Sequence, residues 1–93
     1  MKNLPENVKE YKRTPSFTED SVPKGLLSSH TTKAGTWGKI VIEDGKLLYR
    51  ILEPQIEEVV LSSMKHGVVE PQIPHEVQPL GQVKFHVVFL KQE

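Results

Sequence analysis

The sequence predicts a small all-β protein, a single domain folded as a jelly-roll β-sandwich or barrel. Three observations support this: apolar and polar residues alternate near the C-terminus, glycine and proline separate short apolar runs, and seven of the 93 residues are proline. Alternation is the pattern of a half-buried strand, and proline disfavours the interior of a helix. A chain of this length forms one domain, and short antiparallel strands suit a jelly roll.

The N-terminal quarter is predicted to be extended. Pro5, Pro15 and Pro23 interrupt it, and its apolar residues are scattered without helical spacing. We therefore expect an N-terminal arm over residues 1–10 and a folded domain over residues 11–93.

The middle of the chain is predicted to form a β-hairpin and a further strand. Two runs of apolar, β-branched or aromatic residues flank Asp44-Gly45, a dipeptide typical of two-residue hairpin turns. Ile56–Leu61 follows as a strand, although its apolar spacing also allows a short amphipathic helical turn.

The C-terminal part is predicted to contain a turn and the clearest strand. Pro79-Leu80-Gly81 has turn composition, and the residues after it alternate between apolar and mixed positions. If the face with Phe85 is buried, His86 points outward, because neighbouring side chains of a strand lie on opposite faces.

Composition excludes several classes of protein and site. The chain has no cysteine, which removes disulfides, thiolate metal sites and cysteine nucleophiles. Its net charge of 12 − 12 = 0 and its low aromatic content of six residues argue against a surface that binds nucleic acid. Without a long apolar run we expect no membrane span and no secretory signal, and hence a cytoplasmic location.

The core is expected to be thin, since only 37% of the residues are hydrophobic. A short chain buries a small fraction of its surface, and pairing with a second copy adds buried area. The sequence therefore predicts a homodimer.

One group of polar residues is a candidate site: His30, Lys33, Glu70, Gln72 and His75. Pro71 and Pro74 bracket a tight bend between Glu70 and His75, which restricts the backbone and holds the polar side chains there in a set relation. The same bend is common as a plain turn, in which case the last histidine only ends a strand.

Trp37 lies between two glycines and is the largest apolar side chain available. It either forms the wall of a ligand pocket or packs in the core, as single tryptophans commonly do. No glycine-rich phosphate cradle, nucleophile elbow or zinc-binding helix motif occurs, so we expect no nucleotide or S-adenosylmethionine site.

Three stretches resemble a known family. Glu70-Pro71-Gln72-Ile73-Pro74-His75 is similar to the second cupin motif, whose histidine is a metal ligand. Pro15–Leu27 and His30–Lys39 resemble the small cupin-like domain of the tellurite-resistance protein B (TehB) family. The resemblance extends from about Tyr11 to Leu90.

The resemblance implies a cupin-like jelly roll that is cytoplasmic and dimeric. In full-length members this domain precedes an S-adenosylmethionine-dependent methyltransferase domain, and we expect this chain to end before one. We therefore expect no methyltransferase activity of its own.

The resemblance also implies a ligand set. Most ligands of the first cupin motif are absent, which leaves His30, His75 and Glu70 to hold a divalent metal, with zinc the best match. Lys33, Trp37 and Gln72 are the expected contacts of a bound small molecule or oxyanion.

The expected function is a binding module that holds a metal ion or a small anionic ligand. Two alternatives stay open. One is a metal-dependent enzyme acting on a small molecule, in which His75 and Glu70 form a general base. The other is a dimerisation or docking domain.

Overall fold

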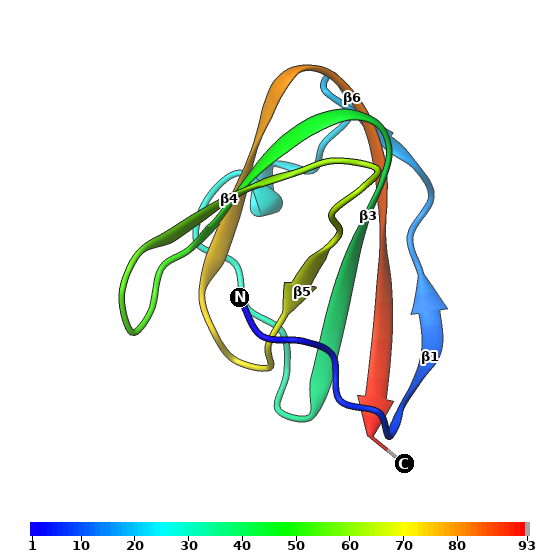
Figure 1. Ribbon diagram of the computed structural model, residues 1–93, viewed down its shortest axis with the longest axis vertical. Coiled ribbons are helices and arrows are strands. Elements are labelled where there is room, and N and C mark those ends of the chain that lie inside the picture. The colour runs from blue at the N-terminus through cyan, green and yellow to red at the C-terminus, as the bar shows by residue number, and fades with distance from the viewer. Residues whose placement is uncertain (93) are drawn as a thin grey trace.

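The structure is a computed structural model that describes residues 1–92 (Figure 1). β-Strands make up nearly all the regular secondary structure of these residues. The elements in chain order are β1 (Val8–Arg13), β2 (Phe17–Thr18), the 3-10 helix η1 (Lys24–Leu26), β3 (Thr36–Ile51), β4 (Glu57–Leu61), β5 (Gly67–Val69) and β6 (His75–Gln92). The prediction of an all-β protein is confirmed.

All the strands join one antiparallel sheet, in the order β1-β6-β3-β4. β2 also pairs with β6, and β5 also pairs with β3. The two long strands pair along their whole length, from Thr36 opposite Lys91 to Ile51 opposite His75. Both bend sharply at the top of Figure 1, so that the two halves of this ribbon face each other.

The predicted hairpin turn at Asp44-Gly45 is wrong, because β3 runs through both residues. Gly45 has a φ of +77° and lies opposite Val83 of β6. A Cβ atom on Gly45 would lie 2.0 Å from the carbonyl oxygen of Gln82. Glycine therefore allows two backbones to approach closely at a bulge, where the strand bends, instead of reversing the chain.

The predicted turn at Pro79-Leu80-Gly81 is wrong for a similar reason. β6 continues through it, and Gly81 takes a φ of +87°. The register between β3 and β6 shifts close by, between Gly45 and Leu47. Both glycine-containing segments thus serve as bends of one long ribbon.

The strand predicted at Ile56–Leu61 is confirmed as β4, and the helical alternative does not form. It connects to β5 through a tight turn in which Ser62 and Lys65 exchange two backbone hydrogen bonds of 3.0 Å. The sequence pattern identified both the strand and its end.

The first residues of the chain pack against the sheet. The amino group of Met1 forms an ion pair with Glu57, and its Sδ accepts a 3.2 Å hydrogen bond from the N–H of Val68. β1 begins at Val8 and so crosses the expected boundary between residues 10 and 11.

The core lies between the facing halves of the ribbon. Its buried hydrophobic residues come mostly from alternate positions of β3 and β6, and they are Ile40, Ile42, Leu47, Tyr49, Ile51, Leu61, Val69, Val77, Val83, Phe85 and Val87. This alternation follows from the pleat of the strands. Within residues 1–92 no helix has the length and hydropathy to span a membrane.

Candidate functional site

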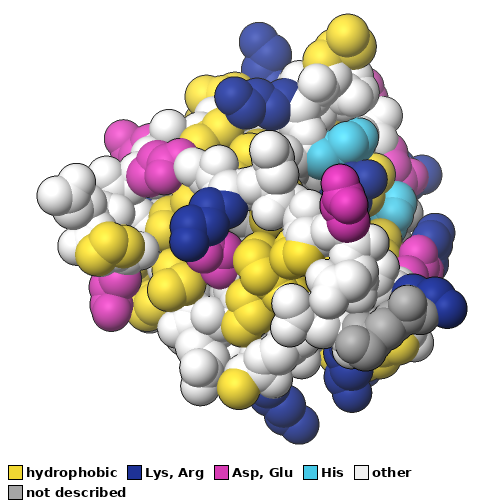
Figure 2. Space-filling view, turned by 60° about the horizontal axis from the view of Figure 1, so that its bottom comes forward, with side chains coloured by type: hydrophobic (Ala, Val, Ile, Leu, Met, Phe, Trp, Pro, Cys, Tyr) yellow, Lys and Arg dark blue, Asp and Glu magenta, His cyan; other side chains and the backbone are white. Residues whose placement is uncertain are grey.

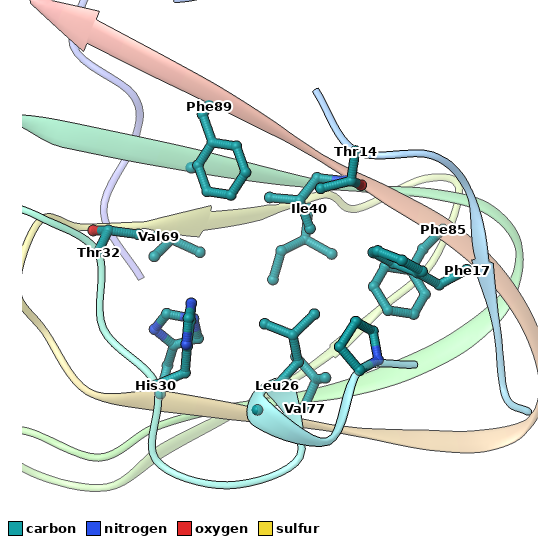
Figure 3. A pocket seen from close by; sticks show the side chains of 15 residues that line it. Thr14, Phe17, Leu26, His30, Thr32, Ile40, Val69, Val77, Phe85 and Phe89 are labelled. Carbon is teal, nitrogen blue, oxygen red and sulfur yellow. The ribbon is translucent and has the colours of Figure 1, made fainter. Parts of the chain in front are cut away.

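A cavity of about 250 Å³, partly open to solvent, lies at one end of the core (Figure 3). Its walls come from β2, η1, β3, β5 and β6 and from the segments that follow β1 and η1. The lining residues are Thr14, Phe17, Pro23, Gly25, Leu26, His30, Thr32, Gly38, Ile40, Val69, His75, Val77, Phe85, Val87 and Phe89.

Most of the wall is apolar because it is made of the inward positions of the strands. Figure 3 shows Phe89 and Ile40 on one side of the space and Leu26 and Val77 on the other. Phe17 and Phe85 close one end, with their ring centroids 5.7 Å apart in an edge contact. Among residues 1–92, no lysine, arginine, aspartate or glutamate lines this cavity.

The two threonine hydroxyls of the wall bind the protein's own backbone. Thr14 Oγ1 accepts a 3.0 Å hydrogen bond from the N–H of Val87 and donates one of 2.9 Å to the carbonyl of Pro15. Thr32 Oγ1 donates to the carbonyl of Thr36 at 2.9 Å. These hydroxyls stabilise the local backbone and offer little to a ligand.

His30 and His75 provide the remaining polar groups. Their backbones exchange hydrogen bonds of 2.8 and 2.9 Å, and their ring centroids lie 5.4 Å apart at an interplanar angle of 89°. Nδ1 of His75 is 3.2 Å from the carbonyl oxygen of Ile73. The ring of Tyr49 also packs edge-on against that of His75, with the two centroids 5.7 Å apart.

The imidazole of His75 favours its neutral form. Its side chain is buried, and this burial lowers its pKa from the ordinary 6.5, although the hydrogen bond with Ile73 opposes the shift. The nearby ring of His30 lowers this pKa further. The buried part of the cavity thus favours uncharged groups.

The other expected ligand contacts lie outside the cavity wall. Lys33 and Gln72 are exposed, and Gln72 sits in a turn with a φ of +63°. Trp37 is half-buried on β3 between Thr36 and Gly38, whose positions face inward, so Trp37 belongs to the opposite face of the strand. The structure brings together only the two histidines of the expected group.

Glu70 does not join the histidines. It lines a second hollow with Lys2, whose Nζ is 3.4 Å from its carboxylate. Within the part of the chain that the structure describes, no group of three or more His, Cys, Asp or Glu residues could hold a metal ion. The predicted zinc set of His30, His75 and Glu70 therefore does not form, because a tetrahedral site requires its donors around one point.

The aromatic wall was not predicted as a site. Phe17, Phe85 and Phe89 form this wall. Of these, the alternation of the sequence assigned only Phe85 to a buried face, and Phe89 lies on the same face of β6, four residues later. The alternation of apolar residues identifies the inward face of the strand. It does not predict the hollow, because the hollow depends on the distance between β6 and η1, which are remote in the sequence.

A second polar cluster lies on the outer face. Glu43 accepts a hydrogen bond from the hydroxyl of Ser16 at 2.5 Å and lies 2.8 Å from Nδ1 of His86. The outward orientation predicted for His86 is confirmed. On the face that Figure 2 shows, basic and acidic side chains are interspersed around a central group of hydrophobic ones.

Comparison with known proteins identifies relatives. Residues 12–87 match the family described as the TehB-like domain. The probable S-adenosyl-L-methionine-dependent methyltransferase TehB of Haemophilus influenzae is 39% identical over 75 residues, which are 76% of this chain and 26% of that protein. The chain thus spans about a quarter of that relative's length.

Two solved structures are similar in fold. The crystal structure of TehB from Haemophilus influenzae superposes with a TM-score of 0.86 at 32% identity, over 94% of this chain and 32% of that one. A protein from Escherichia coli K12 superposes with a TM-score of 0.89 over 100% of this chain and 99% of that one. The second match is 17% identical and shows the fold alone.

These comparisons contradict two predictions. The expected cupin-like binding module without methyltransferase activity is wrong, because the relative at 39% identity is named as a probable methyltransferase. The expectation of no S-adenosylmethionine site is contradicted by the same name. The expected divalent metal has no group of three or more donors to hold it among the described residues. The expected homodimer, and the expected lack of nucleic-acid and membrane partners, stay predictions.

The family predicted from the sequence is confirmed: the chain belongs to the TehB-like domain family.

Proposed function

We propose that this chain takes part in S-adenosylmethionine-dependent methyl transfer as the β-sheet domain of a TehB-type methyltransferase. The observation that carries the proposal is the 39% identity, over 76% of this chain, with a probable methyltransferase of that name. The matching fold of the crystallised TehB, at 32% identity, supports the same role.

The geometry favours a supporting role for the cavity in this reaction. Its wall holds no carboxylate or ammonium group among the described residues, and its buried histidine favours the neutral form. Such a wall suits contact with an uncharged molecule better than activation of a charged one. The proposal includes a cupin-like jelly-roll interior, supported by the bent ribbon around the cavity, and a cytoplasmic location.

A chimera tests the proposed function. This chain replaces the matching third of Haemophilus influenzae TehB, and release of S-adenosylhomocysteine is measured with tellurite, the oxyanion of the family's name, as the acceptor probe. We expect the chimera to release it at a rate within about tenfold of the parent, because the two domains share the fold at 32% identity.

The control is the same relative with its matching third deleted. We expect this truncated protein to lose most of the activity. A folded chimera without activity beside an active parent contradicts the proposal, and so does a truncated protein as active as the intact one.

A further inference from the structure

We infer that the apolar cavity binds a small uncharged molecule, somewhat larger than benzene, whose one polar atom contacts the imidazole of His30. Three features of the cavity carry this inference: its volume, the absence of charge in its described wall, and the hydrogen-bonding capacity left at one end.

The volume sets the size of the ligand. A dry cavity of roughly 150 Å³ lined by aliphatic and aromatic residues takes up benzene. The cavity here measures about 250 Å³, which adds room for one or two substituents. Its partial opening gives such a molecule a way in.

The wall selects against charge. Phe17, Leu26, Ile40, Val77 and Phe89 present only hydrocarbon to the space. An ion placed among them would lose its hydration without gaining a counter-ion, at a cost of many-fold in affinity. The hydroxyls of the wall are already engaged with the backbone.

The ring of His30 is the polar contact. It lines the cavity, is half-buried, and makes no hydrogen bond within residues 1–92. The ring of His75 next to it already uses Nδ1 at the carbonyl of Ile73. A ligand hydroxyl or ether oxygen near His30 would therefore complete a hydrogen bond that the protein leaves open.

The proposed function suggests the natural class of ligand, and this step alone rests on it. When a methyl group passes from the sulfonium of S-adenosylmethionine to an anionic acceptor, the donor becomes neutral S-adenosylhomocysteine and the acceptor loses one negative charge. Methylation therefore converts a charged acceptor into a more apolar, less charged product. The cavity fits such a methylated product better than the oxyanion.

Titration of the protein with matched probes tests the inference. Toluene, p-cresol and p-toluate have nearly the same shape and differ in a hydroxyl or a carboxylate. The ¹³C signals of the methyl groups that line the cavity report binding, those of Leu26, Ile40, Val69, Val77 and Val87. We expect saturable shifts with the two neutral probes and at least tenfold weaker binding of p-toluate.

Substitutions locate the site. Leu26→Trp adds a larger side chain to the cavity wall from η1 and is expected to weaken p-cresol binding at least tenfold, whereas Leu27→Trp, on the neighbouring exposed residue, leaves it within twofold. His30→Phe is expected to remove a preference of about fivefold for p-cresol over toluene and to leave toluene binding intact. Amide spectra confirm that each variant is folded.

The outcomes separate the inference from the proposed function. Tighter binding of p-toluate than of p-cresol overturns the inference, as do shifts confined to methyl groups outside the cavity or no saturable shift in the wild-type protein. The titration of the wild-type protein tests the inference by itself, even if Leu26→Trp does not fold. Methyl benzoate against benzoate, which differ by one methyl transfer to a carboxylate oxygen, tests the product class: equal or tighter binding of benzoate contradicts that step, whatever the chimera's activity.

Discussion

His30 and His75 are joined through both backbone and side chain, although 75 − 30 = 45 positions separate them in the sequence. Two backbone hydrogen bonds of 2.8 and 2.9 Å connect them, and their rings meet edge to face at 5.4 Å. This pair attaches the segment after η1 to the start of β6. It therefore both closes one side of the cavity and places a buried titratable ring beside it.

Stability should rise with pH just below 6.5. Burial lowers the pKa of His75 from 6.5 in the folded state, so the unfolded chain binds more protons as the pH falls through that value. The stabilisation is present above pH 6.5 and is lost progressively below it, down to the lowered pKa. Urea unfolding between pH 5 and 8 measures this, and His75→Gln should flatten the dependence. An equal slope in both proteins would contradict the assignment.

Gly45→Ala should destabilise the protein more than Gly81→Ala. Both glycines have a positive φ, but a Cβ at Gly45 meets the Gln82 carbonyl oxygen, whereas the space around Gly81 is open. Gly81→Ala should cost about 1–2 kcal/mol from the backbone conformation. Gly45→Ala should add about 1–3 kcal/mol of steric strain. Chemical unfolding measures the free energy of unfolding of both variants. Equal losses of stability would contradict this prediction, because they would mean that β6 moves away from the new Cβ atom without an energetic penalty.

Tyr49→Phe should reduce stability by about 1–3 kcal/mol. The buried hydroxyl of Tyr49 donates a 3.0 Å hydrogen bond to the carbonyl of Val68, and burial raises its pKa far above the ordinary 10.0. Removal of the hydroxyl leaves that carbonyl without this donor while the ring still fills the core. Tyr11→Phe, on an exposed residue, is the matched control and should change stability by less than about 0.5 kcal/mol.

Ser16→Ala should raise the pKa of Glu43. The hydroxyl of Ser16 is the largest cause that holds this pKa below the ordinary 4.5, followed by His86. A donor to the charged carboxylate favours that form, so this contribution to stability is present above pH 4.5 and lost as the pH falls through the lowered pKa. The ¹³Cδ chemical shift of Glu43 measures its midpoint. Ser28→Ala is the control, and an unchanged midpoint in Ser16→Ala would refute the contact.

The pattern of the chain predicted its strands better than its turns. Alternation identified the inward face of β6 at Phe85, and the short apolar run identified β4. The same rules placed a hairpin at Asp44-Gly45, where the structure has a bulge. A positive φ serves either purpose, and only the position of Gln82 on the neighbouring strand distinguishes the two.

The candidate site was likewise predicted only in part from the sequence. The sequence indicated that His30 and His75 belong together, and the structure joins them. The sequence pattern also assigned Glu70 to this site, but in the structure Glu70 follows β5 and its carboxylate lies near Lys2 in another hollow. Side chains five positions apart can point to different surfaces when a turn such as that at Gln72 lies between them.

The sequence by itself determined the all-β class, the family and the inward positions of the long strands, because local alternation and proline content restrict each segment independently of the others. Only the tertiary structure decided where the long strands bend, that the ring of His30 has no hydrogen-bond partner within residues 1–92, and that no charged side chain of those residues lines the cavity. These features depend on the distance between strands remote in the chain, and that distance is set by packing of the whole core around them.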